Sequence, residues 1–64
     1  MNKIKIILKE QGRSQAWLAE KIGKSYVVTT NYVNNKTQPS ILILYKVAEA
    51  LNVDVRKLLT PSKA

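Results

Sequence analysis

The sequence predicts an all-α fold, a compact bundle of five short helices in a single domain. Apolar residues recur at helical spacing in successive segments, and a glycine, asparagine or proline closes each segment. The links between segments are short, and 64 residues are enough for only one domain. We assign residues 1–60 to this domain and residues 61–64 to a flexible C-terminal tail.

The first helix is predicted over residues 3–11, with Gly12 as its natural end. Its outward side carries three lysines and Glu10, and we interpret the helix as scaffold. Its inward face is formed by Ile4, Ile7, Leu8 and Gln11.

A second helix is predicted over residues 15–22, with Ser14 as its N-cap and Gly23 as its end. Trp17 lies off the inward face. We expect it to be half-buried against a neighbouring helix, although stacking on DNA or on a partner is an alternative. The inward face contains Gln15, Leu18, Ala19 and Ile22.

Residues 25–34 are predicted to form a third helix, although their composition also suits a β-strand. The residues from Tyr26 to Thr30 all favour strands. However, Ser25 is a good N-cap, and Asn35 can adopt the left-handed conformation that closes a helix. On a helical wheel the inward side comprises Thr29, Tyr32 and Val33, flanked by Val28. The outward side comprises Val27, Thr30, Asn31 and Asn34, with Tyr26 at its border.

The outward side of this third helix has no formal charge but is rich in hydroxyl, amide and methyl groups. A solvated helix face usually carries Lys and Glu, so an uncharged polar stripe in a basic chain needs another explanation. Amides, hydroxyls and small apolar groups are the groups that read base edges in the major groove of DNA. We therefore interpret residues 25–34 as a DNA-reading helix. For Tyr26 and Val27, packing against a neighbouring helix is the alternative.

The chain then turns over residues 36–40, where Pro39 discourages helix and Ser40 caps a fourth helix that ends at Asn52. Leu42 and Ile43 add more apolar surface than one core face needs. This excess indicates either a surface for self-association or a wider core. The predicted core face consists of Ile41, Leu44, Tyr45, Ala48 and Leu51, with Val47 beside it.

A short fifth helix is predicted after Asp54, which caps it, and Pro61 stops it. Its apolar residues are expected to pack back on the core; they are Val55, Leu58 and Leu59. The second and third helices are joined by Gly23 and Lys24 alone, which is the short glycine-containing turn of a helix-turn-helix unit.

The composition limits the possible functions. Eleven Lys and Arg against four Asp and Glu give a net charge of +7, which implies a polyanionic partner such as nucleic acid. Histidine and cysteine are both absent, so we expect no metal, no cofactor and no enzymatic activity. No apolar run approaches the length of about 20 residues that spans a bilayer. We expect a cytoplasmic protein that does not act at a membrane.

A set of residues in a fixed order extends along nearly the whole chain, roughly from residue 4 to residue 59. Its members are Ser14-Gln15, Leu18-Ala19-Glu20-Lys21-Ile22-Gly23, Ser25, Pro39-Ser40, Ala48-Glu49-Ala50-Leu51-Asn52-Val53 and Leu58-Leu59. At these spacings the set resembles the Cro/phage-repressor (XRE) type of helix-turn-helix DNA-binding domain. The resemblance implies a lambda-repressor-like bundle of five helices, in which the third helix enters the major groove.

The chain departs from this family at three positions. The family usually has isoleucine or valine where Thr29 stands, glutamate where Val33 stands and glycine where Asn35 stands. We expect Thr29 to keep its methyl group in the core and to bond its hydroxyl to a backbone carbonyl one turn earlier. Asn35 should preserve the left-handed closure. Val33 removes an acid near the DNA-facing end, which should favour the approach of phosphate.

The resemblance also implies which residues meet DNA. Asn31 can offer a bidentate amide to adenine and Val27 a methyl contact to thymine, whereas Tyr26 could bond a phosphate through its hydroxyl. The backbone N–H groups at the start of the second helix also favour an anion. The implied base-reading residues are Tyr26, Val27, Thr30 and Asn31. The implied phosphate-contacting residues are Ser14, Gln15, Lys24, Ser25, Asn34 and Lys36.

The expected function is sequence-specific regulation of transcription, of bacterial or phage type. The protein should act as a repressor that binds half-sites on double-stranded DNA as a homodimer. An alternative is the antitoxin of a toxin–antitoxin pair, whose main task is to bind a toxin protein. Both readings predict DNA binding, so the presence of a copurifying protein partner would distinguish them.

Overall fold

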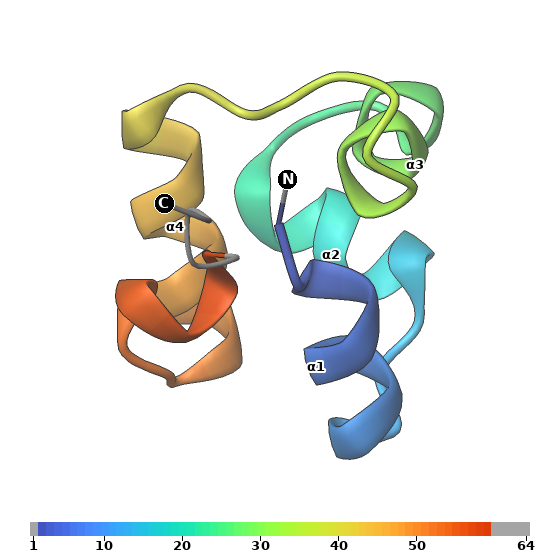
Figure 1. Cartoon of the computed structure of the whole chain (residues 1–64). Helices are drawn as coiled ribbons and strands as arrows, with labels where there is room; N and C mark the ends of the chain where they lie inside the picture. Colours follow the sequence, from blue (N-terminus) through green and yellow to red (C-terminus); the bar gives the residue numbers. More distant parts are fainter. Residues whose placement is uncertain (1, 60–64) are drawn as a thin grey trace.

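The computed structural model describes residues 2–59. This part of the chain contains four α-helices and one 3-10 helix, joined by short links (Figure 1). They are α1 (Ile4–Gln11), α2 (Gln15–Ile22), α3 (Tyr26–Val33), α4 (Ile41–Leu51) and the 3-10 helix η1 (Val55–Leu58). The predicted all-α class is confirmed. The fifth α-helix is not found, because η1 has only four residues and the tighter 3-10 geometry of short pieces. The predicted tail, residues 61–64, lies outside the described residues.

Serine caps begin three of the helices, as the sequence predicts. The hydroxyl oxygens of Ser14, Ser25 and Ser40 each accept a hydrogen bond from the backbone N–H three residues further on, over 3.0–3.2 Å. A cap of this kind stabilises a helix by about 1 kcal/mol. The cap at Ser25 helps to explain why α3 is helical although five of its residues in a row favour strands.

The hydrophobic core is centred on α2, which packs against both α3 and α4. α1 packs against α3, and η1 packs against α4. Trp17 is half-buried at the edge of this core, as expected. Gln11 of α1 is exposed rather than inward, and its side-chain amide donates to the carbonyl oxygen of Leu51 over 2.8 Å. The buried core consists of Ile4, Ile7, Leu8, Leu18, Ile22, Val33, Ile43, Val47, Ala48, Leu51 and Leu58.

The predicted core face of α4 is partly wrong. Ile41 and Tyr45 are 73% and 57% exposed, whereas Ile43 is only 9% exposed and Val47 is fully buried. The helix is rotated about its axis relative to the prediction, so that Ile43 and Val47 point into the core. Ile43 therefore fills the core and is not available for self-association. Leu42, the other residue of the predicted apolar excess, is 77% exposed.

The segment around η1 is held by the Asp54 cap at its start and by a backbone bridge of Leu59 at its end. The Asp54 carboxylate accepts hydrogen bonds from the Arg56 guanidinium and backbone N–H. These bonds, the side-chain bond foremost, lower the pKa of Asp54 to about 2. Leu58 is fully buried, but Leu59 is 45% exposed and does not pack back as predicted. The backbone of Leu59 instead forms an isolated antiparallel bridge with Asn2.

Residues 2 and 3 form what we call the N-terminal strap. The backbone N–H of Lys3 donates to the carbonyl oxygen of Leu58 over 2.7 Å. Asn2 is 6% exposed, and its own Oδ1 accepts from the backbone N–H of Ile4. The strap thus joins the start of the domain to η1, and its remaining bonds reach the last turn of α3 and the segment that follows it.

Candidate nucleic-acid interface

The exposed side of α3 is the first component of the candidate interface. Val27 and Tyr26 are 68% and 57% exposed, so packing against a neighbouring helix does not account for them. Thr30 and Asn31 are half-buried on the same helix, while Thr29 lies in the core beneath. All four residues implied as base readers therefore reach the surface of α3.

The turn between α2 and α3 fixes how this side is presented. Gly23 has a φ of 71°, a left-handed conformation that glycine adopts without steric cost. The backbone N–H of Lys24 returns to the carbonyl oxygen of Ala19 over 3.1 Å, which satisfies a carbonyl at the end of α2. Ser25 then starts α3 at once. Three residues separate the two helices, namely Gly23, Lys24 and the N-cap Ser25, and this is the short glycine-containing turn of a helix-turn-helix unit.

A hydrogen bond ties the middle of α3 to the start of α2. The hydroxyl of Thr30 donates to Oε1 of Gln15 over 2.8 Å. One implied base reader and one implied phosphate contact are therefore in direct contact. The bond uses the donor of Thr30 and leaves the Nε2 amide of Gln15, with two N–H groups, to meet an acceptor such as a phosphate oxygen.

A basic hollow of about 260 Å³ lies at the start of α2. It brings cations from α1 and from the link after it to the two residues implied as phosphate contacts, Ser14 and Gln15. The hollow is lined by Lys5, Leu8, Lys9, Arg13, Ser14, Gln15 and Val33. Three cations beside the N-terminal end of a helix make this a place suited to a phosphate of DNA.

The cations of this hollow are functional candidates that the sequence analysis missed, because α1 was interpreted as scaffold only. Lys5 and Lys9 are one helical turn apart and so share a side of α1, a signal that was present in the sequence. Arg13 lies over the ring of Trp17, with its guanidinium carbon 4.5 Å from the ring centroid. That stacking holds Arg13 beside the start of α2.

Val33 is 1% exposed, and it stabilises the fold by burying apolar surface in the core. It also lines the basic hollow, beside Lys5, Lys9 and Arg13. The expected effect of the missing acid on the approach of phosphate stays a prediction.

Thr29 is fully buried, and its methyl group lies in the core as expected. The expected hydrogen bond to a carbonyl one turn earlier is absent. The hydroxyl oxygen of Thr29 has no hydrogen-bond partner among the described residues. An unsatisfied buried hydroxyl destabilises the folded state, typically by about 1–3 kcal/mol.

The segment after α3 is held by the N-terminal strap. Asn35 has a φ of 60°, which confirms the predicted left-handed closure. Its Oδ1 accepts from the backbone N–H of Asn2 over 2.7 Å, and its Nδ2 donates back to the carbonyl oxygen of Asn2. Nδ2 of Asn2 also donates to the carbonyl oxygen of Tyr32 and to Oε1 of Gln38. Asn34 and Lys36 flank the residue that carries these bonds.

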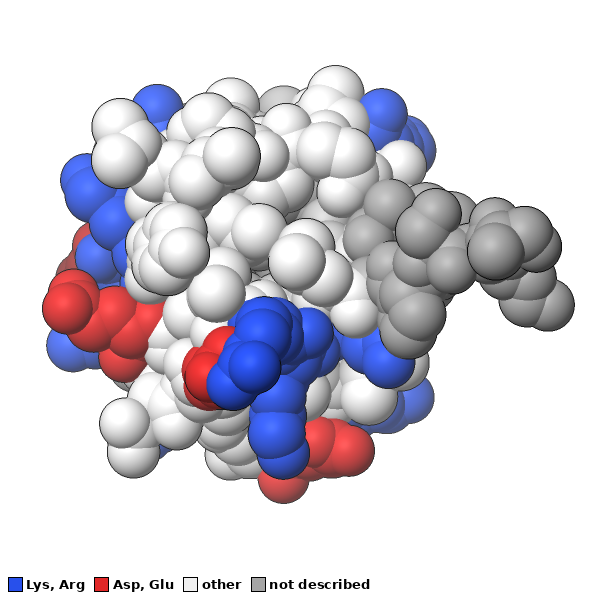
Figure 2. Space-filling view, turned by 60° about the vertical axis from the view of Figure 1, so that its left-hand side comes forward, with Lys and Arg blue, Asp and Glu red and all other residues white. Residues whose placement is uncertain are grey.

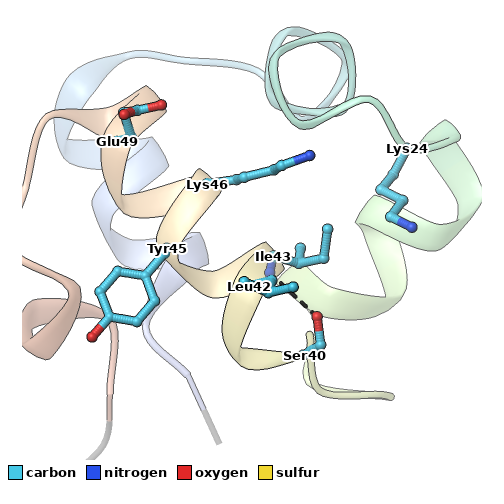
Figure 3. A pocket seen from close by; sticks show the side chains of 7 residues that line it. All are labelled: Lys24, Ser40, Leu42, Ile43, Tyr45, Lys46 and Glu49. Atoms are coloured by element: carbon cyan, nitrogen blue, oxygen red, sulfur yellow. Dashed lines mark hydrogen bonds between the residues drawn. The ribbon is translucent and has the colours of Figure 1, made fainter.

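The implied phosphate contacts fall at three separate places. Ser14 and Gln15 share the basic hollow at the start of α2. Lys24 precedes α3 and lies beside α4 (Figure 3). Asn34 and Lys36, both exposed, follow the end of α3. Polar or basic groups thus lie at the start of α3, after its end and at the N-terminal end of α2.

Comparisons with known proteins agree with this geometry. A family model described as "Helix-turn-helix" matches residues 4–58, which include every helix of the fold. The chain is 50% identical to a protein from Bacteroides fragilis described as a "putative DNA-binding protein", whose crystal structure superposes with a TM-score of 0.88. That alignment covers 91% of this chain and 94% of the other. A comparison with curated proteins gave no match.

Proposed function

The chain belongs to the helix-turn-helix family, in its Cro/phage-repressor (XRE) type, and from this membership we propose that it is a sequence-specific regulator of transcription. It binds double-stranded DNA with α3 in the major groove. It acts by occupying an operator, as a repressor, in the cytoplasm where bacterial DNA lies. Every helix within residues 2–59 is too short or too polar to cross a bilayer.

The observation that carries this proposal is the exposed, uncharged side of α3 on a chain of net charge +7. Val27 presents methyl groups and Asn31 presents an amide, which are the groups that distinguish thymine and adenine in the major groove. Cations surround the helix but do not lie on it. Contacts to phosphates would then fix the position of the protein on the DNA, and the uncharged groups of α3 would recognise the base sequence.

The individual roles follow from the contacts. Asn31 is the main base reader in this proposal, with Val27 and Tyr26 beside it. Thr30 has its hydroxyl donor occupied by Gln15, so it can only accept a hydrogen bond from a base. Ser14, Gln15, Lys24, Ser25, Asn34 and Lys36 contact phosphates, and Lys5, Lys9 and Arg13 join them.

The proposal includes binding as a homodimer. A single reading helix contacts only a few base pairs, which gives too little discrimination in a genome. Two copies on half-sites roughly 34–36 Å apart would supply it.

The experiment is a selection from random-sequence DNA with the full chain, followed by binding measurements on the recovered site. Asn31→Ala should lose discrimination equivalent to about 1–3 kcal/mol between that site and random DNA while keeping most nonspecific affinity. Lys36→Gln is the matched control, because losing a phosphate contact should weaken binding to both DNAs alike. Circular dichroism first confirms that both variants are folded.

Failure of the proposal would be clear. If the parent protein enriches no sequence, it is not a sequence-specific regulator. If folded Asn31→Ala discriminates as well as the parent does, Asn31 does not read bases.

A further inference from the structure

The segment after α3, residues 34–40, contains two of the implied phosphate contacts but has no helix of its own. In Figure 1 it runs as a yellow-green link from the end of α3 to the start of α4. Residues 38–40 donate no hydrogen bond to another backbone group in the described part of the chain. Lys36 is exposed, and it must keep a defined position if it is to meet one phosphate of a bound duplex.

The backbone of this segment ties Lys36 to the reading helix. The backbone N–H groups of Lys36 and Thr37 both donate to the carbonyl oxygen of Asn31, over 2.9 and 3.3 Å. Asn31 is an implied base reader, so the phosphate contact and the base contact are joined through one carbonyl group. A shift of the segment would therefore change the spacing between two side chains that are implied to meet DNA.

Asn2 of the N-terminal strap holds the segment from outside. Its backbone N–H and carbonyl oxygen both pair with the side chain of Asn35. The two N–H groups of its own side-chain amide donate to the carbonyl oxygen of Tyr32 and to Oε1 of Gln38, each over 3.0 Å. Gln38 in turn donates to Oδ1 of Asn35 over 3.2 Å. Asn2, Asn35 and Gln38 thus form a closed ring of hydrogen bonds.

The other end of the strap is anchored away from the charged surface. The backbone N–H of Lys3 donates to the carbonyl oxygen of Leu58, on η1, over 2.7 Å. The side formed by α4 and η1 turns forward in Figure 2, where it is largely uncharged and most Lys and Arg side chains gather toward its margins. Asn2 itself is only 6% exposed, so its side chain cannot reach DNA. Asn2 can therefore influence DNA binding only through the segment that it holds.

We propose that Asn2 is a positioning residue for the binding of double-stranded DNA. Through Asn35 and Gln38 it fixes the segment after α3, so that Lys36 meets a phosphate while Asn31 reads a base. This inference rests on the proposed function and adds to it a residue that does not touch DNA. A network that only stabilised the fold would change the free energy of unfolding but not the DNA affinity of the folded protein. The two roles therefore predict different measurements.

Asn2→Ser is the variant that separates the two roles. A serine hydroxyl can still accept from the backbone N–H of Ile4, and the backbone of residue 2 can still pair with Asn35, but the two amide N–H donors are lost. Asn52→Ser is the matched control, because it makes the same exchange at an exposed residue with a φ of 55°, where serine is strained. The control lowers stability without touching the strap. Circular dichroism first confirms that both variants are folded.

Operator affinity of folded Asn2→Ser should fall about three- to tenfold, as expected for residues that are coupled, while Asn52→Ser keeps the affinity of the parent protein. The logarithmic salt slope should become shallower by about 0.9, the value of one phosphate contact. Lys36→Gln should then weaken binding less in the Asn2→Ser protein than in the parent, because its phosphate contact is already lost. If folded Asn2→Ser keeps the parental affinity and the parental effect of Lys36→Gln, the inference is overturned.

Amide hydrogen exchange tests the same inference in the free protein. The backbone N–H of Lys36 should exchange several-fold faster in Asn2→Ser, because its bond to Asn31 opens more often once the segment is less firmly held. The backbone N–H of Val47, in the middle of α4, should exchange as in the parent. Unchanged exchange at Lys36 would mean that Asn2 does not hold the segment.

These outcomes can be separated from failure of the proposed function. If the parent enriches no DNA sequence, the regulator proposal falls, but a salt slope on random DNA that becomes shallower in Asn2→Ser would still support the role of Asn2. If the parent is sequence-specific and Asn2→Ser keeps its affinity and salt slope, the regulator proposal stands and the inference falls. A parent protein that binds no DNA would overturn both.

Discussion

The hydroxyl of Thr30 and the side-chain carbonyl of Gln15 are joined by a hydrogen bond of 2.8 Å across the two helices of the helix-turn-helix. Thr30 belongs to the reading helix and Gln15 to the start of α2, where the basic hollow lies. The bond fixes the orientation of the Gln15 amide. Base reading and phosphate contact should therefore depend on each other at this point.

The first prediction is a coupling between these residues. Thr30→Val and Gln15→Ala should each weaken operator binding, and the double variant should lose less than the two single losses combined. For residues in contact, such coupling typically amounts to roughly 0.5–3 kcal/mol. The measurement is a double-mutant cycle on DNA affinity. Gln15→Ala with Lys36→Gln is the control pair and should be additive. Additivity of Thr30 with Gln15 would mean that the bond plays no part in binding.

The second prediction concerns the basic hollow. Operator affinity should fall steeply with salt, because each phosphate contact contributes a slope of about −0.9 in the logarithmic plot. Replacing Lys5 and Lys9 together by glutamine should make that slope shallower by roughly one to two such contacts. Lys57→Gln, on η1 away from the hollow, should leave it unchanged. If the double variant keeps the salt dependence of the parent protein, Lys5 and Lys9 do not contact phosphates and α1 only supports the fold.

The third prediction concerns the buried hydroxyl of Thr29. Thr29→Val keeps the shape of the side chain and removes an oxygen that has no hydrogen-bond partner among the described residues. We expect a gain in unfolding free energy of about 1 kcal/mol, or roughly 4–8 °C in melting temperature for a domain of this size. DNA affinity should not change, because Thr29 is fully buried. Thr29→Ser keeps the oxygen, loses the methyl group and should destabilise. A lower melting temperature for the valine variant would show that the hydroxyl is satisfied in solution.

The fourth prediction runs against the usual preference of the family. Glycine normally stands where Asn35 does, and glycine adopts a positive φ at less cost. Asn35→Gly should nevertheless destabilise the domain, because it removes the side-chain hydrogen bonds to Asn2. The backbone N–H of Asn2, a residue that is only 6% exposed, then loses its acceptor. The expected loss is on the order of 1–3 kcal/mol by denaturant unfolding. Asn52→Gly is the control: Asn52 also has a positive φ, but its side chain makes no hydrogen bond within residues 2–59, so this change should be neutral or stabilising. A stabilised Asn35→Gly would mean that the strap contributes little.

Sequence reasoning located α1, α2 and α3 well. In α1 and α2, charged residues mark the outer side of the helix. In α3, the Ser25 cap and the left-handed conformation of Asn35 mark the two ends. Sequence reasoning failed on the rotation of α4, where Ile41 to Tyr45 are all apolar and no polar residue marks the outer side. An unbroken apolar run of this kind predicts a helix but cannot indicate which residues face the core.

The candidate site was predictable to a similar extent. The surface side of α3 follows from its helical wheel, and Tyr26 and Val27 are indeed exposed. The bond between Gln15 and Thr30 and the bonds of Asn2 were not predictable. Gln15 and Thr30 are 15 positions apart, and Asn2 lies 30 to 36 positions from its partners Tyr32, Asn35 and Gln38. Such pairings leave no local pattern in a single sequence.

The N-terminal strap has a consequence for the order in which the domain can fold. The backbone N–H of Lys3 donates to the carbonyl oxygen of Leu58, and Asn2 forms a bridge with Leu59. The two ends of the described chain are therefore hydrogen-bonded to each other. Ribosomes release the amino end first and add about 5–20 residues per second. Asn2 and Lys3 therefore emerge without their partners on η1. The nascent chain can form α1, α2 and α3 early, but it can close the domain only after residue 59 has left the ribosome.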